Sequence, residues 1–347
     1  MIERFSMSKV RWGRGTGLCL ALAACGGDEV TGTDAGDSGG ADAGRNGAAD
    51  AADGTSGDAG STSAPYTYSA CASDERVGGF NILADEGGGY SSVAGQVLDG
   101  IVPANVADPV TTSGDCVLLR GRQLFCDPAC SPQETCDVDG SCIPYPRPHD
   151  VGTVHVKGLL DEVDIEPIAP AFAYSNRGTL THPAFEEGAP IELSAEGGEY
   201  DPFSLAAEGV APLDLGDITV MLEDGSPVEL AWTAPEKPGQ AHVLVTLNIS
   251  LHGGNPVRIE CEAEDTGALT IPADLVSELL SYGYSGFPAI EIVRQTASSK
   301  QLSIGCIDLR VGSTRTRVPV EIEGATSCND DDDCADGETC QDDALCG

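Results

Sequence analysis

Cysteine is the residue whose number and spacing most clearly indicate chemistry in this 347-residue chain, which contains 14 cysteines. Structural zinc sites usually pair their ligands as Cys-x2–4-Cys, and within the two cysteine clusters only Cys126 and Cys130 satisfy that spacing. An even set of cysteines in an exported chain is typical of a disulfide framework. We therefore predict that twelve cysteines form disulfides: Cys71, Cys116, Cys126, Cys130, Cys136, Cys142, Cys261, Cys306, Cys328, Cys334, Cys340 and Cys346.

The acidic loops of the C-terminal cluster offer oxygen ligands of the kind that Ca²⁺ prefers. Aligned with an EF-hand loop from Asp332, the chain has Asp336 at the fifth position, a cysteine at the third, and Asp343 instead of glutamate at the last. The EF-hand pattern therefore fails, and a solvated acidic surface is the simpler interpretation. Asp332, Asp336 and Asp343 are the candidate ligands for Ca²⁺, the one cofactor for which we find candidates.

Catalytic motifs are scarce. The five histidines show no HExxH spacing, and the chain has neither a phosphate-binding loop nor a dinucleotide fingerprint. The segment 36–40 (GDSGG) matches a Gly-x-Ser-x-Gly elbow, but no predicted strand precedes it and no helix follows it. We predict no catalytic residue. A pair of carboxylates far apart in sequence, as in glycoside hydrolases, stays open because the chain has 56 acidic residues.

The first 25 residues have the pattern of an export signal. Four basic residues precede an uncharged run, 15–24, which is too short for a transmembrane helix of about 20 residues. The run ends in Leu22-Ala23-Ala24-Cys25, which resembles the lipobox of bacterial lipoproteins. A plain signal peptide, in which Cys25 is incidental, is the alternative.

The resemblance implies that residues 1–24 are a removed signal peptide. Cys25 would then carry diacylglycerol on its sulfur and a fatty acyl group such as palmitate on its amine. Two or more acyl chains hold a protein firmly on a membrane, so we expect a lipid-anchored protein of the outer membrane, facing the periplasm or the cell surface. The cysteine clusters also resemble small cysteine-rich modules of bacterial cell-surface proteins.

Charge narrows the range of partners. The formal net charge is −38, and removal of residues 1–24 takes away four positive charges and one negative charge, which gives −41. Such a surface repels nucleic acid. We therefore expect no nucleic acid as a partner, whereas divalent cations or a basic partner are compatible with this charge. The ligand we expect is a surface glycan or a protein, because rigid scaffolds with variable loops commonly serve recognition.

Composition predicts a mainly β protein, because aromatic residues are few (5%) while glycine (44) and proline (21) are abundant. We expect a disordered Gly/Ala/Asp/Ser tether over 25–65, a small β and cysteine-rich region over 66–148, and an acidic cysteine-rich module over 326–347. Between them, about nine alternating segments over 149–325 predict an antiparallel β-sandwich.

One short helix is predicted inside the sandwich, from Pro272 in its first turn to Gly283 as its C-terminal cap. Cys261 and Cys306 both fall in predicted strands of this domain and have no other cysteine nearby. We therefore expect these two cysteines to pair with each other.

These observations favour a membrane-anchored, non-enzymatic surface protein for binding or adhesion. The alternatives are a secreted hydrolase that uses carboxylates and a structural component of the envelope. Two carboxyl groups about 5–10 Å apart in a cleft, or a histidine hydrogen-bonded to serine or aspartate, would favour the hydrolase.

Overall fold

A computed structural model describes residues 66–236, 240–249 and 257–347 of the chain. The predicted signal peptide (1–24), Cys25 with its lipobox and the predicted tether (25–65) lie outside the described residues. The described residues belong to one compact unit.

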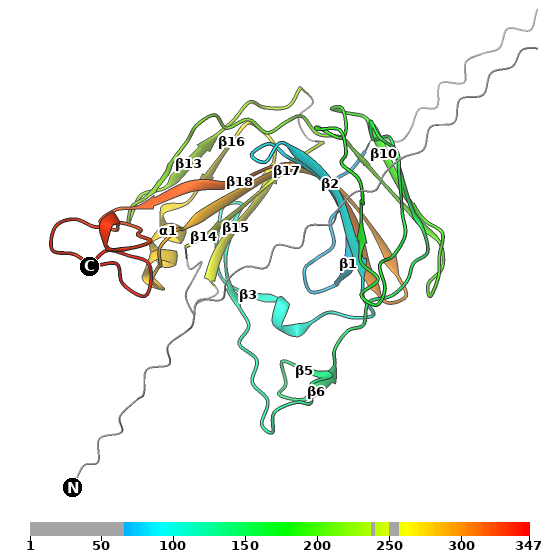
Figure 1. The fold of residues 1–347 in the computed structure, drawn as a ribbon, viewed down its shortest axis with the longest axis horizontal. Coiled ribbons are helices and arrows are strands. Elements are labelled where there is room, and N and C mark those ends of the chain that lie inside the picture. The colour runs from blue at the N-terminus through cyan, green and yellow to red at the C-terminus, as the bar shows by residue number, and fades with distance from the viewer. Residues whose placement is uncertain (1–65, 237–239, 250–256) are drawn as a thin grey trace, which may run out of the picture. The chain divides into compact units, whose positions relative to one another are not determined.

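Strands dominate the described residues (Figure 1). They are β1 (Arg76–Asp85), β2 (Tyr90–Val97), β3 (Ala107–Ser113), β4 (Cys116–Gly121), β5 (Glu134–Cys136), β6 (Cys142–Pro144), β7 (Val154–Lys157), β8 (Val163–Ile165), β9 (Tyr174–Ser175), β10 (Pro190–Ala195), β11 (Phe203–Glu208), β12 (Val220–Leu222), β13 (Val228–Ala231), β14 (His242–Asn248), β15 (Val257–Glu264), β16 (Ala268–Ile271), β17 (Ala289–Leu302) and β18 (Gly305–Ile322). Two 3₁₀ turns cover Pro103–Asn105 and Asp331–Asp333, and α1 (Ala273–Ser281) is the single α-helix of the described ranges. The predicted mainly β class, with one short helix and disulfide-rich modules, is confirmed.

The helix α1 forms where the sequence predicted it. Pro272 occupies the N-cap position, where a missing backbone N–H costs nothing, and Gly283 takes a φ of +86° just beyond the last turn. Leu275, Val276 and Leu279 are buried on one face. The helix therefore packs against the core through a single apolar stripe.

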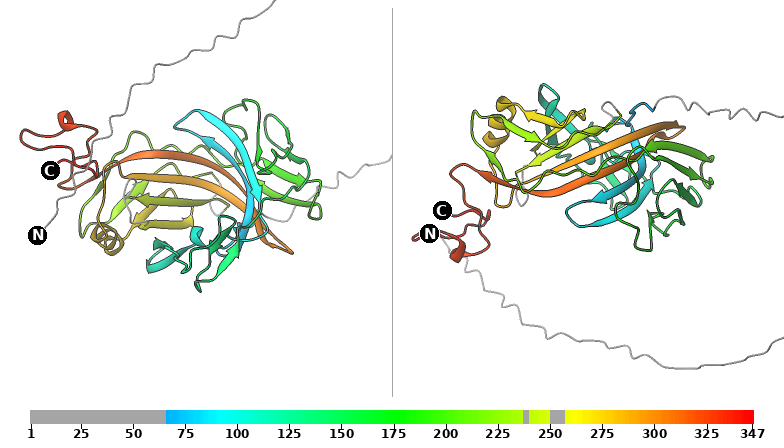
Figure 2. Two further views of the ribbon diagram at one scale, coloured as in Figure 1. Left: turned by 60° about the horizontal axis from the view of Figure 1, so that its bottom comes forward. Right: turned by 90° about the horizontal axis from the view of Figure 1, so that it is seen from above.

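The main sheet has the strand order β3-β4-β15-β14-β17-β18-β1-β2-β9. Its centre is the long antiparallel pair β17–β18, which runs in register from the turn at Leu302 and Gly305 to Ala289 opposite Pro319, with one bulge. The other edge of β18 pairs in parallel with β1 and, farther along, with β12. Figure 2 shows β17 and β18 running from the region of β1 to the C-terminal segment. The sheet is therefore mixed, with two parallel pairs among antiparallel ones.

The first hydrophobic core lies between one half of the main sheet and a second sheet, β11-β10-β7-β8. Phe80 and Ile82 of β1 and Leu309 of β18 face Leu193 of β10 and Phe203 of β11, and all five are buried. Figure 1 shows this second sheet, at β10, beside β1 and β2. Two packed β layers with alternating inward side chains make this half a β-sandwich.

The second core lies under the other half of the same sheet. Leu118, Val245 and Ile292 of the main sheet pack with Leu230 of β13 and Leu275 of α1. The two-stranded sheet β13-β16 and the helix α1 thus supply its cover. One continuous sheet therefore serves two separate cores.

A buried ion pair lies where the two cores meet. The Arg294 side chain, 1% exposed, donates from Nε to Asp265 Oδ2 at 2.5 Å, and the Asp265 side chain is fully buried. The guanidinium also donates to the carbonyl oxygens of Ala211, Pro212 and Thr233. Arg294 of β17 thereby binds three connecting segments, which contain Ala211 and Pro212, Thr233, and Asp265. These contacts satisfy the guanidinium donors away from water.

Asp265 is held from the other side as well. Its Oδ1 accepts hydrogen bonds from the indole N–H of Trp232 at 2.8 Å and from the backbone N–H of Gly267 at 3.1 Å. The carboxylate therefore receives donors on both oxygens, which offsets the cost of its burial.

All twelve predicted cysteines form disulfides: Cys71–Cys306, Cys116–Cys261, Cys126–Cys136, Cys130–Cys142, Cys328–Cys340 and Cys334–Cys346. The expected Cys261–Cys306 bond is wrong. In the main sheet β14 and β17 separate β15 from β18, and three strand spacings of roughly 4.8 Å exceed the reach of a disulfide, about 7 Å between Cα atoms.

The predicted boundary near 148/149 also needs correction. β1 pairs with β18 and β4 pairs with β15, so strands from both sides of the boundary share one sheet. The bonds Cys71–Cys306 and Cys116–Cys261 cross the same boundary. Partners far apart in sequence leave no local signal in either strand, which is why the sequence placed them in two domains.

Loss of the buried Arg294 charge should destabilise the whole fold. We expect Arg294→Met to lower the free energy of unfolding by about 3–5 kcal/mol, because Asp265 would stay buried without its cationic partner. The matched control is Arg258→Met, because the side chains of Arg258 and of its partner Glu260 are both partly exposed. This substitution should lower the free energy of unfolding by no more than about 1 kcal/mol. Denaturant titration followed by Trp232 fluorescence measures both, and equal losses would contradict the prediction.

Candidate binding groove

An open, mostly apolar groove of about 1050 Å³ lies at one end of β18. It lies between the end of β18, the segment 285–288 that precedes β17, and the C-terminal cysteine module. Its apolar side chains include Met221, Phe287, Pro319 and Leu345. Large, mostly apolar concave sites are where ligands bind most often in proteins.

The groove forms because the segment before β17 leaves β18. Pairing stops at Ala289 opposite Pro319, although β18 continues to Ile322. The N–H of Gly286 instead donates to Asp343 O at 2.7 Å, and the N–H of Phe287 donates to Ser327 Oγ at 3.2 Å. The segment therefore binds the C-terminal module and leaves a gap beside β18.

Glycine is required at position 286. A Cβ there would collide with the backbone oxygen of Ala344. The next residue, Phe287, takes a φ of +61°, a conformation that residues other than glycine, asparagine and aspartate rarely adopt. The close approach of this segment to the C-terminal module thus depends on Gly286.

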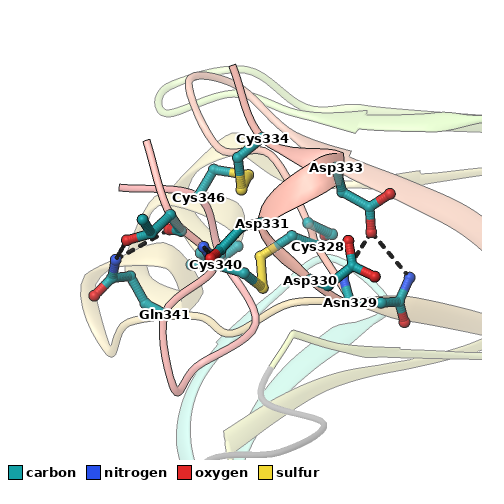
Figure 3. The surroundings of a disulfide bond; sticks show 12 residues. Cys328, Asn329, Asp330, Asp331, Asp333, Cys334, Cys340, Gln341 and Cys346 are labelled. Atoms are coloured by element: carbon teal, nitrogen blue, oxygen red, sulfur yellow. Dashed lines mark hydrogen bonds between the residues drawn. A yellow bond between two sulfur atoms is a disulfide. The ribbon is translucent and has the colours of Figure 1, made fainter. Parts of the chain in front are cut away.

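The C-terminal module forms one wall of the groove without a hydrophobic core of its own. Cys328–Cys340 and Cys334–Cys346 cross-link its turns, as Figure 3 shows. Asp333 accepts hydrogen bonds from the backbone N–H and the side-chain amide of Asn329, and Asp331 accepts one from the N–H of Cys340 (Figure 3). Disulfides and aspartate-capped turns therefore supply the order that a segment this small cannot obtain from apolar burial.

The N-terminal cysteine cluster has the same connectivity. Cys126–Cys136 and Cys130–Cys142 join the first cysteine to the third and the second to the fourth, as in the C-terminal module. Both clusters contain consecutive Cys-x5-Cys steps, so the spacing alone indicates a repeated module, but it leaves the connectivity of the cysteines open.

The structure does not bring the calcium candidates together. Asp332, Asp336 and Asp343 are exposed, and they belong to no described group of three possible ligands within 4.8 Å of one another. The groups that meet this distance consist of cysteines that are already in disulfides, so they offer no thiolate to a metal. Asp343 instead contributes its backbone oxygen to the contact with Gly286.

The charged side chains that line the groove are both acidic. Glu321 and Glu323 lie on exposed positions at the end of β18. This site was not predictable from sequence patterns, because the groove depends on where β17 separates from β18. The one local signal was the Gly286-Phe287-Pro288 run, in which proline cannot donate to a ladder.

A serine, a histidine and a glutamate lie in the order of a hydrolase triad. Ser91 Oγ is 3.0 Å from His182 Nδ1, and His182 Nε2 is 3.6 Å from Glu86 Oε2. Glu86 in turn accepts a hydrogen bond from Ser313 Oγ at 2.8 Å. Ser91 is only 6% exposed. The Ser91–His182 hydrogen bond meets the criterion that the sequence set for the hydrolase alternative. Because Ser91 is buried, the geometry nevertheless fits a structural contact between β2 and β18 better than an accessible nucleophile.

Two other histidines lie between carboxylates. His155 Nδ1 is 2.6 Å from Asp164 Oδ1, and Nε2 is 3.3 Å from Glu196 Oε1. The bonds to Asp164 and then to Glu196 raise the pKa of His155 above 6.5, and the pKa of Glu196 is lowered by the same contact. Both carboxylates favour the charged imidazolium.

His149 is placed similarly, between Glu199 and Asp99. Partial burial lowers its pKa, but the two carboxylates outweigh that effect and the net shift of the His149 pKa is upward. Asp99 and Glu199 lie at opposite nitrogens of the ring, so they do not converge on one metal position.

Among the described residues, no helix is long and apolar enough to cross a lipid bilayer.

Comparisons with known proteins assign no family. No family model matches the chain, and no curated protein matches it. One solved structure that matches is "Crystal structure of chicken CNTN1 FN1-FN3 domains", with 11% identity over 64% of this chain and 69% of that chain. Its TM-score is 0.15, so this likeness carries no argument about function.

The ion pairs of His155 should make the thermal stability of the protein depend on pH. Because the folded-state pKa of His155 is raised above 6.5, its stabilising contribution is fully present below the unfolded pKa and is lost as pH rises through the folded pKa. The difference in thermal midpoint between wild type and His155→Gln should therefore be larger at about pH 5.5 than at about pH 8.5. Asp164→Asn with Glu196→Gln should remove the same difference. A difference in thermal midpoint that does not change with pH would show that these ion pairs do not stabilise the fold.

Proposed function

We propose that this chain is a lipid-anchored, non-enzymatic binding protein of the bacterial outer membrane, and that the groove beside β18 receives a protein ligand. The observation that carries the proposal is the groove itself, an open, mostly apolar cavity of about 1050 Å³ lined by the end of β18, the segment 285–288 and the C-terminal module. Soluble proteins seldom expose a large apolar surface unless it binds something.

The anchor is supported by the lipobox residues Leu22-Ala23-Ala24-Cys25. Six disulfides among the described residues agree with an exported protein, since such bonds persist in oxidising compartments.

The attachment of the N-terminal segment to the body of the protein also supports the proposal. Tyr66 Oη donates to the oxygen of Ala297 in β17 at 2.6 Å, and Cys71 is bonded to Cys306 at the start of β18. The groove begins at Ala289, eight residues away in the same strand, or about 26 Å at 3.3 Å per residue. A load on the membrane tether would therefore reach the Cys71–Cys306 bond before it could disturb the groove.

The groove should bind a neutral apolar probe. We expect Nile red to fluoresce with the mature chain that carries serine at position 25, and Met221→Asp and Leu345→Asp to weaken that signal at least threefold by placing a charge in the groove. Leu160→Asp is the matched control, because Leu160 and Met221 are each 52% exposed and Leu160 lies outside the groove. Equal loss in all three variants, or no fluorescence with the unmodified groove, would refute the groove as a binding surface.

Attachment to the membrane should depend on Cys25. We expect the wild-type chain to enter the detergent phase on Triton X-114 separation, and Cys25→Ser to shift most of it into the aqueous phase, because only a thiol can carry the lipid. Cys19→Ser is the control and should leave the wild-type distribution unchanged. If Cys25→Ser partitions like the wild type, the protein is not a lipoprotein.

A further inference from the structure

The edge of β18 that borders the groove has no strand beside it. β17 pairs with β18 only as far as Ala289 opposite Pro319, whereas β18 extends to Ile322. On the opposite edge the same stretch pairs in parallel with β12. In the described residues, Val320–Ile322 therefore has a ladder partner on one side only.

The orientation of the backbone can be read from one hydrogen bond. The N–H of Glu323 donates to Leu222 O of β12 at 2.9 Å. Because backbone groups alternate between the two edges of a strand, Glu321 also faces β12, while Val320 and Ile322 face the groove. Ile322 O accepts from the N–H of Ala325 at 3.0 Å in the following turn. The N–H of Val320 points at Pro288, the residue before Ala289, because Pro319 has no N–H to pair with Ala289. The C=O of Val320 and the N–H of Ile322 are left to face the groove.

The side chains around this edge define what could occupy it. Met221, Phe287 and Leu345 offer apolar contacts, and the charged lining residues are Glu321 and Glu323. A second copy of this chain, paired through the same edge, would bring the glutamates of both copies together. Because like charges oppose edge-to-edge pairing, a second copy is a poor occupant of the groove. The chain's own segment 26–65 carries eight acidic residues and one arginine, so it is also poorly matched in charge.

We propose that the groove binds an extended segment of a partner protein in which lysine or arginine alternates with apolar residues, and that this segment adds to β18 as a new strand. Main-chain hydrogen bonds to Val320 and Ile322 would supply affinity, as in other cases of strand addition. The apolar side chains enter the groove and the basic ones meet Glu321 and Glu323. This inference rests on the proposed function, because it names the chemistry of the groove's ligand.

A labelled peptide tests the idea directly. The probe is fluorescein-Lys-Val-Lys-Val-Lys-Val-Lys-amide, measured by fluorescence anisotropy on the mature chain with serine at position 25. We expect saturable binding of this peptide and at least tenfold weaker binding of the Glu-Val counterpart. A version N-methylated at alternate residues, which cannot donate hydrogen bonds along one edge, should also bind at least tenfold more weakly.

Charge reversal locates the site. Glu321→Lys with Glu323→Lys should weaken the Lys-Val peptide at least tenfold and strengthen binding of the Glu-Val peptide. The matched control is Glu192→Lys with Glu229→Lys, which changes the net charge equally at exposed strand positions outside the groove. The control should change affinity less than threefold at about 0.15 M salt, where distant charges are screened.

Three results would overturn the inference: no binding of the Lys-Val peptide, equal binding of its N-methylated form, or equal weakening by the control pair. The Nile red experiment distinguishes a failure of this inference from a failure of the proposed function. If Nile red binds the groove but the peptide does not, only the chemistry of the partner is wrong. If neither binds, the groove is not a binding surface and the proposed function fails as well.

Discussion

The ion pair between Arg294 and Asp265 stands where two hydrophobic cores share one sheet. Without it, the connections through Pro212 and Thr233 would have no common partner at the middle of β17. A buried arginine is costly unless its donors are satisfied, and here the carboxylate and three carbonyl oxygens meet it. A long strand can thus continue from one core to the next, because the polar residues between them are fully paired.

The long pair β17–β18 links this junction to the candidate site. At one end, Cys306 bonds the start of β18 to Cys71, next to the segment that leads toward the predicted tether. At the other end, β18 continues beyond β17 and forms one side of the groove. The contact with the N-terminal segment and the groove therefore lie at opposite ends of one strand pair, with the buried ion pair between them. This arrangement fits the proposed role of presenting a binding surface.

The small cysteine module contributes to the site by its position. Its turns are held by two disulfides and by aspartate side chains, and its contacts with Gly286 and Phe287 draw the start of β17 away from β18. Of the acidic residues that suggested calcium in the sequence, Asp343 instead caps a turn, since its Oδ1 accepts a hydrogen bond from the N–H of Leu345 at 3.3 Å. Composition alone does not distinguish these two roles, because both need exposed carboxylate oxygens on short loops.

The sequence by itself determined what depends on neighbouring residues. Strand alternation, the helix between Pro272 and Gly283, and the cysteine repeat were all readable, because each arises from a pattern within about twenty residues. Tertiary structure alone decided the pairing of Cys71 with Cys306, the parallel placement of β1 on β18, and the gap at Ala289 that opens the groove. These features join segments as many as 235 residues apart. They were settled by which apolar faces the two cores could bury together, and no local pattern records that choice.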